Sequence, residues 1–189
     1  MLDISKSICK KLDAYYASGK LDKIEGFLLA ELIKNQPLCG EFNSAYITVL
    51  YEMGVYLRKT KKYARSRDWF KLLGRTVCIH LGPDSFEHAV VLENIAAAYE
   101  LDGEFGQALH FYLQTLKIYN SIAGPRPIRH AELLKHVCRL FRAQGDYKAA
   151  VLLQENLYGG KDMESLEELF GEPEPPCKHK VLPFRQKQE

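Results

Sequence analysis

Apolar positions recur at helical spacing between residues 92 and 112. Leu92 and Tyr99 lie on one helical face, Gly103 interrupts the pattern, and Tyr112 belongs to an apolar face that resumes after the glycine. This pattern predicts two helices joined by a tight turn. Upstream, Pro83 is expected in a turn and Asp84 at the N-cap of the first of these helices.

Small residues alternate with large ones in the same stretch. Ala96 and Ala108 stand where two helix backbones would approach closely, so their side chains must be small. Larger side chains are expected to fill the core around such crossings here and in the following repeat: Tyr99, Phe105, Tyr112, Phe141 and Tyr147.

The same hairpin pattern repeats along the chain. The residue that opens the second helix recurs at intervals of 42 residues, at Leu21, Tyr63, Phe105 and Tyr147. The turn before it falls at Gly19, Lys61, Gly103 and Gly145, and a glycine ends the hairpin at Gly40, Gly82 and Gly124. One hairpin cannot bury its own apolar faces, so this repetition predicts hairpins stacked on one another.

The hairpin resembles the tetratricopeptide repeat, which is usually about 34 residues long. The longer step, with LGPDSFEHA preceding LENIAAAYELDGEFGQALHFYLQTLKIY, resembles the repeats of kinesin light chains and related proteins. This resemblance covers roughly residues 5 to 158. It implies an all-α fold, a right-handed α-solenoid of about four hairpins.

The expected domain organisation is a solenoid over residues 1–160, followed by two shorter segments. Its repeats are expected at about 5–46, 47–88, 89–130 and 131–158. The segment DMESLEELF predicts a capping helix within 161–171, with Asp162 as N-cap and one apolar face formed by Met163, Leu166, Leu169 and Phe170. The proline-rich and charged residues 172–189 predict a disordered or extended tail.

The resemblance also implies a binding groove, in which the first helix of each hairpin lines a concave face that holds a peptide or a partner's helix. The positions carried over by register are Lys6, Asp13, Tyr16, Thr48, Tyr51, Glu52, Val55, Arg58, Val90, Glu93, Asn94, Ala97, Glu100, Glu132, Lys135, His136, Arg139 and Arg142. Asn94 matches an asparagine with which kinesin-type repeats hold a peptide backbone. The residues expected to contact the partner are Tyr51, Arg58, Asn94, Lys135, His136, Arg139 and Arg142.

The last repeat carries a basic helix face. Lys135, Arg139 and Arg142 are spaced i, i+4, i+7, which places them on one side of a helix. We interpret them as a site for an acidic or C-terminal segment of a partner, with a merely solvated face as the alternative. Glu93 and Glu100 would repel a terminal carboxylate in the middle of the groove, which argues against the chaperone-tail-binding class of tetratricopeptide domains.

Two other functions remain open at this point. The first is an RNA-binding helical repeat that uses the cations in the second helix of repeat two, although a solvated face is the simpler interpretation of these residues. The cations are Lys61, Lys62, Arg65, Arg67, Lys71 and Arg75. The chain could also be a regulatory subunit whose partner carries an enzyme activity. We expect no nucleic-acid partner, and homo-oligomerisation is left open.

Composition excludes several further classes of protein. The 189 residues are 47% hydrophobic with a net charge of +2, as expected for a folded domain without a strong global field. Five cysteines without a CxxC pair, and an N-terminus without an apolar run, predict free thiols in a cytoplasmic protein. No apolar run approaches the length of about 18 residues that a membrane span needs.

Signatures of catalysis are lacking in the sequence. The six histidines include no HExxH, and the close Cys and His pairs lack further ligands at metal spacing. GxGxxG, GxSxG and a phosphate-binding glycine loop are also missing. We therefore expect no enzyme activity, cofactor or metal, and a protein or peptide as the partner.

Overall fold

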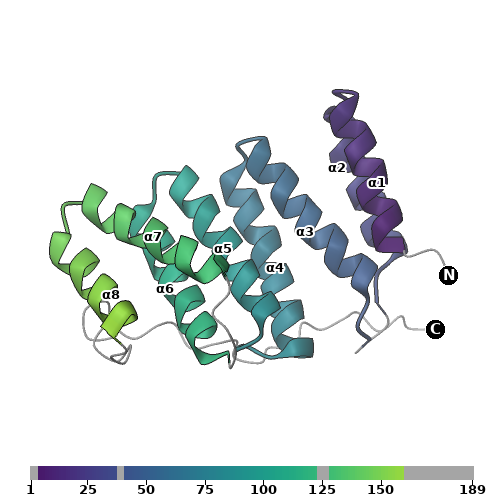
Figure 1. The fold of residues 1–189 in the computed structure, drawn as a ribbon. Helices are drawn as coiled ribbons and strands as arrows, with labels where there is room; N and C mark the ends of the chain where they lie inside the picture. Colours follow the sequence, from purple (N-terminus) through teal and green to yellow (C-terminus); the bar gives the residue numbers. More distant parts are fainter. Residues whose placement is uncertain (1–3, 38–40, 123–127, 160–189) are drawn as a thin grey trace. The chain divides into compact units, whose positions relative to one another are not determined.

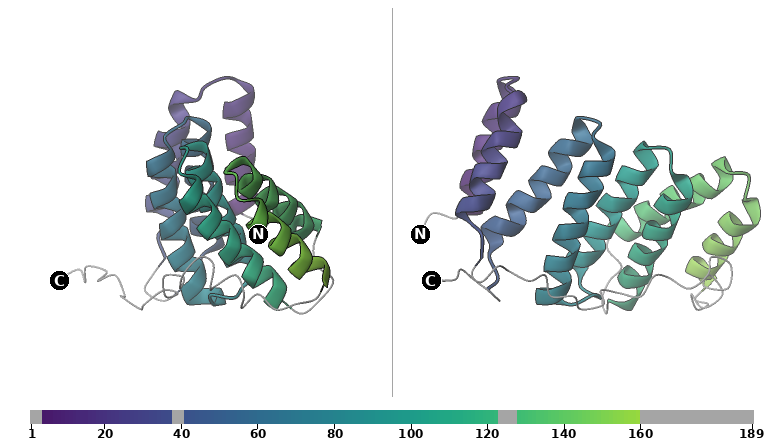
Figure 2. Two further views of the ribbon diagram at one scale, coloured as in Figure 1. Left: turned by 90° about the vertical axis from the view of Figure 1, so that its left-hand side faces the viewer. Right: turned by 180° about the vertical axis from the view of Figure 1, so that it is seen from behind.

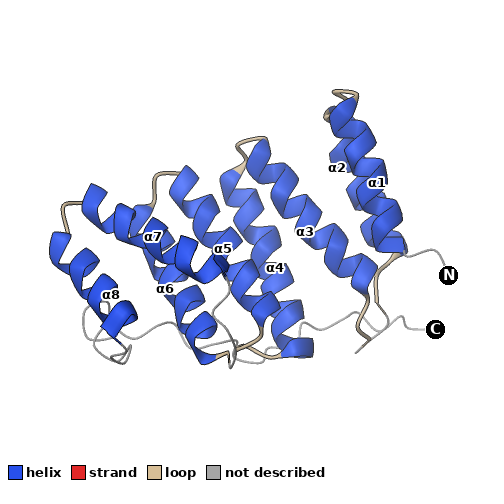
Figure 3. Cartoon of the chain, viewed as in Figure 1, coloured by secondary structure: helices blue, strands red, loops and turns tan. Residues whose placement is uncertain are grey.

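The computed structural model describes residues 4–37, 41–122 and 128–159. Across these ranges the chain contains eight helices and no strand (Figure 3). They are α1 (Ile4–Ala17), α2 (Asp22–Lys34), α3 (Ser44–Lys59), α4 (Tyr63–Leu81), α5 (Phe86–Leu101), α6 (Phe105–Ser121), α7 (Ile128–Ala143) and α8 (Tyr147–Gly159). The predicted all-α class, built of helical hairpins, is confirmed.

Short turns pair the helices as α1–α2, α3–α4, α5–α6 and α7–α8 (Figure 1). The four turns have a positive φ at the predicted positions: 68° at Gly19, 60° at Lys61, 83° at Gly103 and 82° at Gly145. Glycine adopts this left-handed conformation without steric cost, which explains its recurrence. The other glycine predicted to end a hairpin within the described residues, Gly82, also has a positive φ, of 91°.

The chain divides into two compact units at His80. The N-terminal unit contains α1 to α4, and the C-terminal unit contains α5 to α8. The repeat bounds inferred from the sequence stay predictions. The capping helix expected within 161–171, the tail 172–189, and the glycines expected to end hairpins at Gly40 and Gly124 lie outside the described residues.

In the N-terminal unit, α1 and α2 both pack against α3 around buried Leu12, Leu28 and Met53. The contact between α3 and α4 depends on a missing side chain. A Cβ added to Gly54 would lie 2.7 to 2.8 Å from ring atoms of Phe70, which is fully buried. The hydroxyl of Ser66 also donates to the carbonyl of Gly54 at 2.7 Å, so the two helices meet at small residues.

In the C-terminal unit, α6 packs against both α5 and α7, and α7 packs against α8. The two further views in Figure 2 show α5 and α6 side by side. Ala96 and Ala108 are fully buried between them, as predicted from their size. Cys138 and Ala150 repeat this small pair in the next hairpin, where the Cys138 thiol lies 3.7 Å from the Ala150 carbonyl.

Two predicted core residues lie at the surface. Tyr112 and Phe141 are buried as expected, and Tyr99 is half-buried against Phe111, but Phe105 is 43% exposed and Tyr147 is 65% exposed. Each of the last two is the first residue of a second helix, directly after the turn at the tip of its hairpin. Their place in the core was therefore predicted wrongly.

The expected cap of α5 is also displaced by one residue. Ser85, and not Asp84, is the N-cap, because its hydroxyl oxygen accepts a hydrogen bond from the backbone N–H of His88 at 3.2 Å. The same hydroxyl donates to the carbonyl of Gly82 at 2.9 Å. The His88 ring is buried against this turn, with Nδ1 2.6 Å from the carbonyl oxygen of Pro83.

Candidate functional site

The basic residues of α7 form an exposed row. Lys135, Arg139 and Arg142 are exposed, whereas Val137 and Phe141 on the opposite side of α7 are buried. We call these three residues the α7 cationic row. Three cations on consecutive turns of one helix face create a local positive potential that the small net charge of the chain does not reveal.

One carboxylate of the C-terminal unit joins three helices. Glu100 Oε2, at the end of α5, lies 2.9 Å from His136 Nε2 on α7 and accepts a hydrogen bond of 2.8 Å from the Tyr112 hydroxyl on α6. The rings of Tyr112 and His136 meet edge to face, 5.3 Å between centroids. We call Glu100, Tyr112 and His136 the Glu100 junction. It holds the first helices α5 and α7 next to each other.

The junction gives His136 a role that the sequence did not indicate. His136 was predicted to contact a partner, yet its Nε2 faces Glu100 and its side chain is 36% exposed. Tyr112 was predicted only as core. Its hydroxyl reaches across to α5, and the sequence offered no signal for this contact beyond the 42-residue repeat of a large ring at Phe70 and Tyr112.

Glu93, seven residues before Glu100 on α5, has the same kind of partner. The Tyr119 hydroxyl on α6 donates to Glu93 Oε2 at 3.2 Å. Both carboxylates expected to repel a terminal carboxylate therefore accept a tyrosine hydroxyl from α6, and both remain half-buried. Glu100 also joins this face of α5 to α7 through His136.

Asn94 is turned toward its own helix. Its side chain is 6% exposed, and Nδ2 donates to the carbonyl of Val90 at 2.8 Å. In this state the amide stabilises the backbone of α5. Contact between Asn94 and a bound peptide backbone stays a prediction.

Tyr51 and Arg58 lie in the N-terminal unit, where they flank Phe70 of α4. The Tyr51 ring meets Phe70 edge to face at 6.0 Å, and the Arg58 guanidinium lies 5.9 Å from the Phe70 centroid. Both side chains are half-buried. Both contact the ring that packs against Gly54, and they belong to a different unit from the α7 cationic row.

The repeat shows why α7 differs from the other first helices. Positions 51 and 58 of α3 correspond, 42 residues apart, to 93 and 100 of α5 and to 135 and 142 of α7. On α3 the side chains at these positions flank the Phe70 ring. On α5 the Glu100 carboxylate accepts a hydrogen bond from the hydroxyl of Tyr112, the equivalent of Phe70. The next equivalent position in the sequence is Gln154, where the two preceding repeats have Phe70 and Tyr112.

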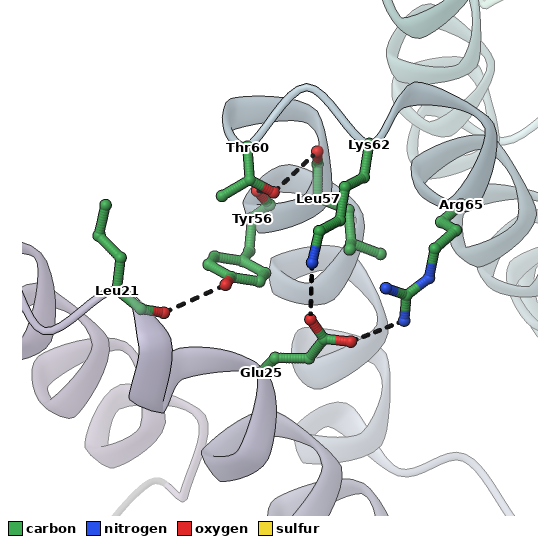
Figure 4. Close-up of polar contacts among 7 residues, drawn as sticks. All are labelled: Leu21, Glu25, Tyr56, Leu57, Thr60, Lys62 and Arg65. Carbon is green, nitrogen blue, oxygen red and sulfur yellow. Dashed lines mark hydrogen bonds and ion pairs between the residues drawn. The ribbon is translucent and has the colours of Figure 1, made fainter.

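The basic helix α4 is partly neutralised by α2. Glu25 accepts from Arg65 Nη2 at 2.6 Å and from Lys62 Nζ at 3.2 Å (Figure 4). The hydrogen bond from Arg65 is the main reason why the pKa of Glu25 lies below its ordinary value. Beside it, the Tyr56 hydroxyl donates to the Leu21 carbonyl at 3.1 Å. Two of the six candidate RNA-binding cations are therefore used to join neighbouring hairpins.

Within the described ranges, no three His, Cys, Asp or Glu side chains converge as a metal-ligand set. In the same ranges, no helix combines the length and the apolarity needed to cross a membrane. Among the described cysteines, Cys9 and Cys78 are half-buried and Cys138 is buried. Burial raises the pKa of the Cys138 thiol, which therefore acts as a small packing residue.

The fold and the site together define a helical-repeat protein, with small residues at the helix crossings and polar first-helix faces. A family model described as tetratricopeptide repeat matches residues 88–130, which include most of α5 and all of α6. The chain thus contains a tetratricopeptide repeat in this segment. A search of curated proteins finds no match to the chain.

Proposed function

We propose that this chain is a non-catalytic adaptor, with repeats of the kinesin light chain type, that binds an acidic or C-terminal segment of a protein partner. Tetratricopeptide repeats are typically protein-interaction modules, and residues 88–130 match one. We also propose that the interaction takes place in the cytoplasm, because the sequence has an odd number of cysteines and no CxxC pair.

The observation that carries this proposal is the exposure of the α7 cationic row. Arginine forms paired, charge-assisted hydrogen bonds with carboxylates, and lysine adds a mobile positive charge. The first and last residues of the row are seven helical steps apart, or about 10 Å at a rise of about 1.5 Å per residue. An extended peptide covers that distance in about three residues, so the row fits a short acidic run.

The Glu100 junction sets the limits of this site. It links α7 to α5 through His136, which follows Lys135 of the row in the sequence, so the Glu100 carboxylate is one residue removed from the row. A partner carboxylate is attracted to the row and repelled from the junction, so charge fixes its position along the helix. In this proposal Asn94 contacts the remainder of the partner segment within the C-terminal unit, and His136 lines the edge of the site. Tyr51 and Arg58 are proposed as partner contacts of the N-terminal unit by itself.

A defined peptide tests the row directly. The probe is a fluorescein-labelled peptide with four consecutive glutamates in a serine and glycine background, and its control carries glutamines instead. We expect the full chain to bind only the glutamate peptide. Substituting Arg139→Glu with Arg142→Glu should weaken binding at least tenfold because like charges then face each other. Fluorescence anisotropy measures both.

The matched control reverses two charges elsewhere. Lys61 and Arg75 are exposed on the turn before α4 and on α4 itself. Substituting both with glutamate changes the net charge by the same amount, and it should leave binding of the glutamate peptide unchanged. Equal losses in the two double variants would show that total charge, and not the α7 cationic row, attracts the peptide.

RNA binding through α4 is the alternative function. Lys62 and Arg65 are engaged with Glu25, which weakens the case for a continuous cationic stripe. Binding to RNA would fall steeply with salt, because each phosphate contact releases counterions. It would also be lost in the Lys61→Glu, Arg75→Glu variant and retained in the α7 variant, the reverse of the pattern expected for the adaptor.

A further inference from the structure

The last helix has an apolar outer face. Ala149, Ala150 and Leu153 on one side of α8 are fully buried, and α8 packs against α7. On the opposite side, Val151 is 47% exposed and Leu152 is 40% exposed, beside the exposed ring of Tyr147. We call Tyr147, Val151 and Leu152 the α8 outer face.

The preceding hairpin shows how such a face is covered. Val151 of α8 occupies the position of Leu109 in α6, 42 residues earlier. Leu109 is only 5% exposed, in a helix against which α7, the first helix of the next hairpin, packs. Val151 is about nine times more exposed at the equivalent place. A second helix in this repeat is therefore shaped to receive a further helix.

The sequence directly after α8 has the complementary pattern. α8 ends at Gly159, and only Gly160 and Lys161 precede the segment 162–170. In the sequence this segment carries apolar residues on one helical face, at Met163, Leu166, Leu169 and Phe170. Four of its five polar positions are acidic, and the exposed α8 side carries Lys148, with which one of these carboxylates could pair.

We propose that residues 162–170 of this chain form a helix that packs on the α8 outer face and buries Val151 as Leu109 is buried. Antiparallel helices are commonly joined by loops of about two to five residues, which the short connection satisfies. Nine helical residues extend about 13 Å, and Val151 lies about 12 Å before the end of α8. The segment is therefore long enough to return to Val151. This inference is independent of the partner proposed for α7.

Hydrogen exchange on the full chain tests the contact. In a helix over 162–170 the amides of Leu166 to Phe170 donate to carbonyls four residues earlier, so these amides are the ones that become protected. We expect them to exchange at least tenfold more slowly than in an unstructured reference peptide of the same sequence. Val151→Asp should abolish this protection, whereas the nearly isosteric Val151→Thr should retain most of it.

A second variant separates lost contact from a damaged α8. Leu166→Asp leaves α8 intact in sequence, and it should speed exchange at the amides around Val151 while those of α5 and α6 stay unchanged. Reference-rate exchange of Leu166 to Phe170 in the wild type would overturn the proposal. Protection that weakens on tenfold dilution would overturn it as well, because a second copy would then supply the cover.

Discussion

Lys61 occupies a backbone conformation that glycine holds in the equivalent turns. Its φ is 60°, and among the described residues it is the one non-glycine residue with a positive φ. The left-handed conformation costs an L-residue about 1 to 2 kcal/mol, part of which is offset by the greater freedom of glycine in the unfolded chain. We expect Lys61→Gly to raise the free energy of unfolding by about 1 kcal/mol.

The equivalent change in the opposite direction serves as its control. Gly103→Ala, at φ 83°, has no atom within 4 Å of the added Cβ, so only backbone strain should act. We expect a loss of about 1 kcal/mol in urea unfolding. An unchanged or lower stability of Lys61→Gly would mean that the Lys61 side chain makes a compensating contact.

Gly54 has a different reason for being glycine. Its added Cβ would lie 2.7 Å from the Phe70 ring, which is fully buried and has little room to move. Gly54→Ala should therefore destabilise the fold by about 1 to 3 kcal/mol through overpacking. Gly106→Ala is the matched helix variant, since nothing lies within 4 Å of its Cβ, and it should be neutral or stabilising. Equal effects of the two variants would contradict the contact with Phe70.

Glu52 provides a pH-dependent test in the N-terminal unit. Burial, with a smaller contribution from Asp13, raises its pKa above the ordinary value of 4.5, and Lys59 opposes the shift. The folded state thus holds the Glu52 proton more tightly than the unfolded state. The free energy of unfolding therefore falls as pH rises from the ordinary pKa through the raised one.

We expect Glu52→Gln to be more stable than the wild type at pH 7, with the advantage shrinking as the pH approaches 4. Urea unfolding at several pH values measures this difference. Asp13→Asn is a useful companion, because it removes the smaller of the two causes and should give a smaller gain. If the difference in free energy of unfolding between the wild type and Glu52→Gln did not change with pH, the pKa of Glu52 would not be raised.

Helix pairs depend on small residues at their crossing points. Ala108 is fully buried between α5 and α6, so Ala108→Glu would place an unpaired charge in a site without room for it. The cost should exceed the usual range of about 0.5 to 3 kcal/mol and unfold the C-terminal unit. Circular dichroism measures the loss of helix. A fully folded variant would contradict the assigned crossing.

Local chemistry made the helices and their turns predictable. Periodic apolar positions with a turn residue every 42 residues locate the hairpins at Gly19, Lys61, Gly103 and Gly145, because turn chemistry is decided by neighbouring residues. Exposure at the hairpin tips was not predictable in this way. Phe105 and Tyr147 match the apolar pattern, but burial depends on what packs beyond the tip.

The candidate site could be predicted only in part for a similar reason. The i, i+4, i+7 spacing of the α7 cationic row is a property of one helix, and the structure places all three residues at the surface. The Glu100 junction needs α5, α6 and α7 at their final separations. Spacing within one helix does not contain that information, so the hydrogen bond from Tyr112 to Glu100 was missed.

Charge is distributed unevenly over the molecule, although its net value is only +2. In the N-terminal unit Glu25 engages Lys62 and Arg65 of the basic helix, whereas α7 in the C-terminal unit exposes three cations on one face. Exposed ion pairs such as those of Glu25 contribute at most about 1 kcal/mol each. The α7 cationic row gathers three exposed cations on one helix face, and this makes it our candidate for recognising an anion.

Affinity capture from nuclease-treated lysate tests the adaptor function most directly. The full wild-type chain is compared with the Arg139→Glu, Arg142→Glu double variant and with the Lys61→Glu, Arg75→Glu double variant. Melting temperatures are measured first, to verify that all three chains are equally folded. The retained proteins are then identified by mass spectrometry. We predict a set of proteins retained by the wild type and the Lys61, Arg75 variant but lost from the Arg139, Arg142 variant. Identical retention by all three chains would contradict binding through the α7 cationic row.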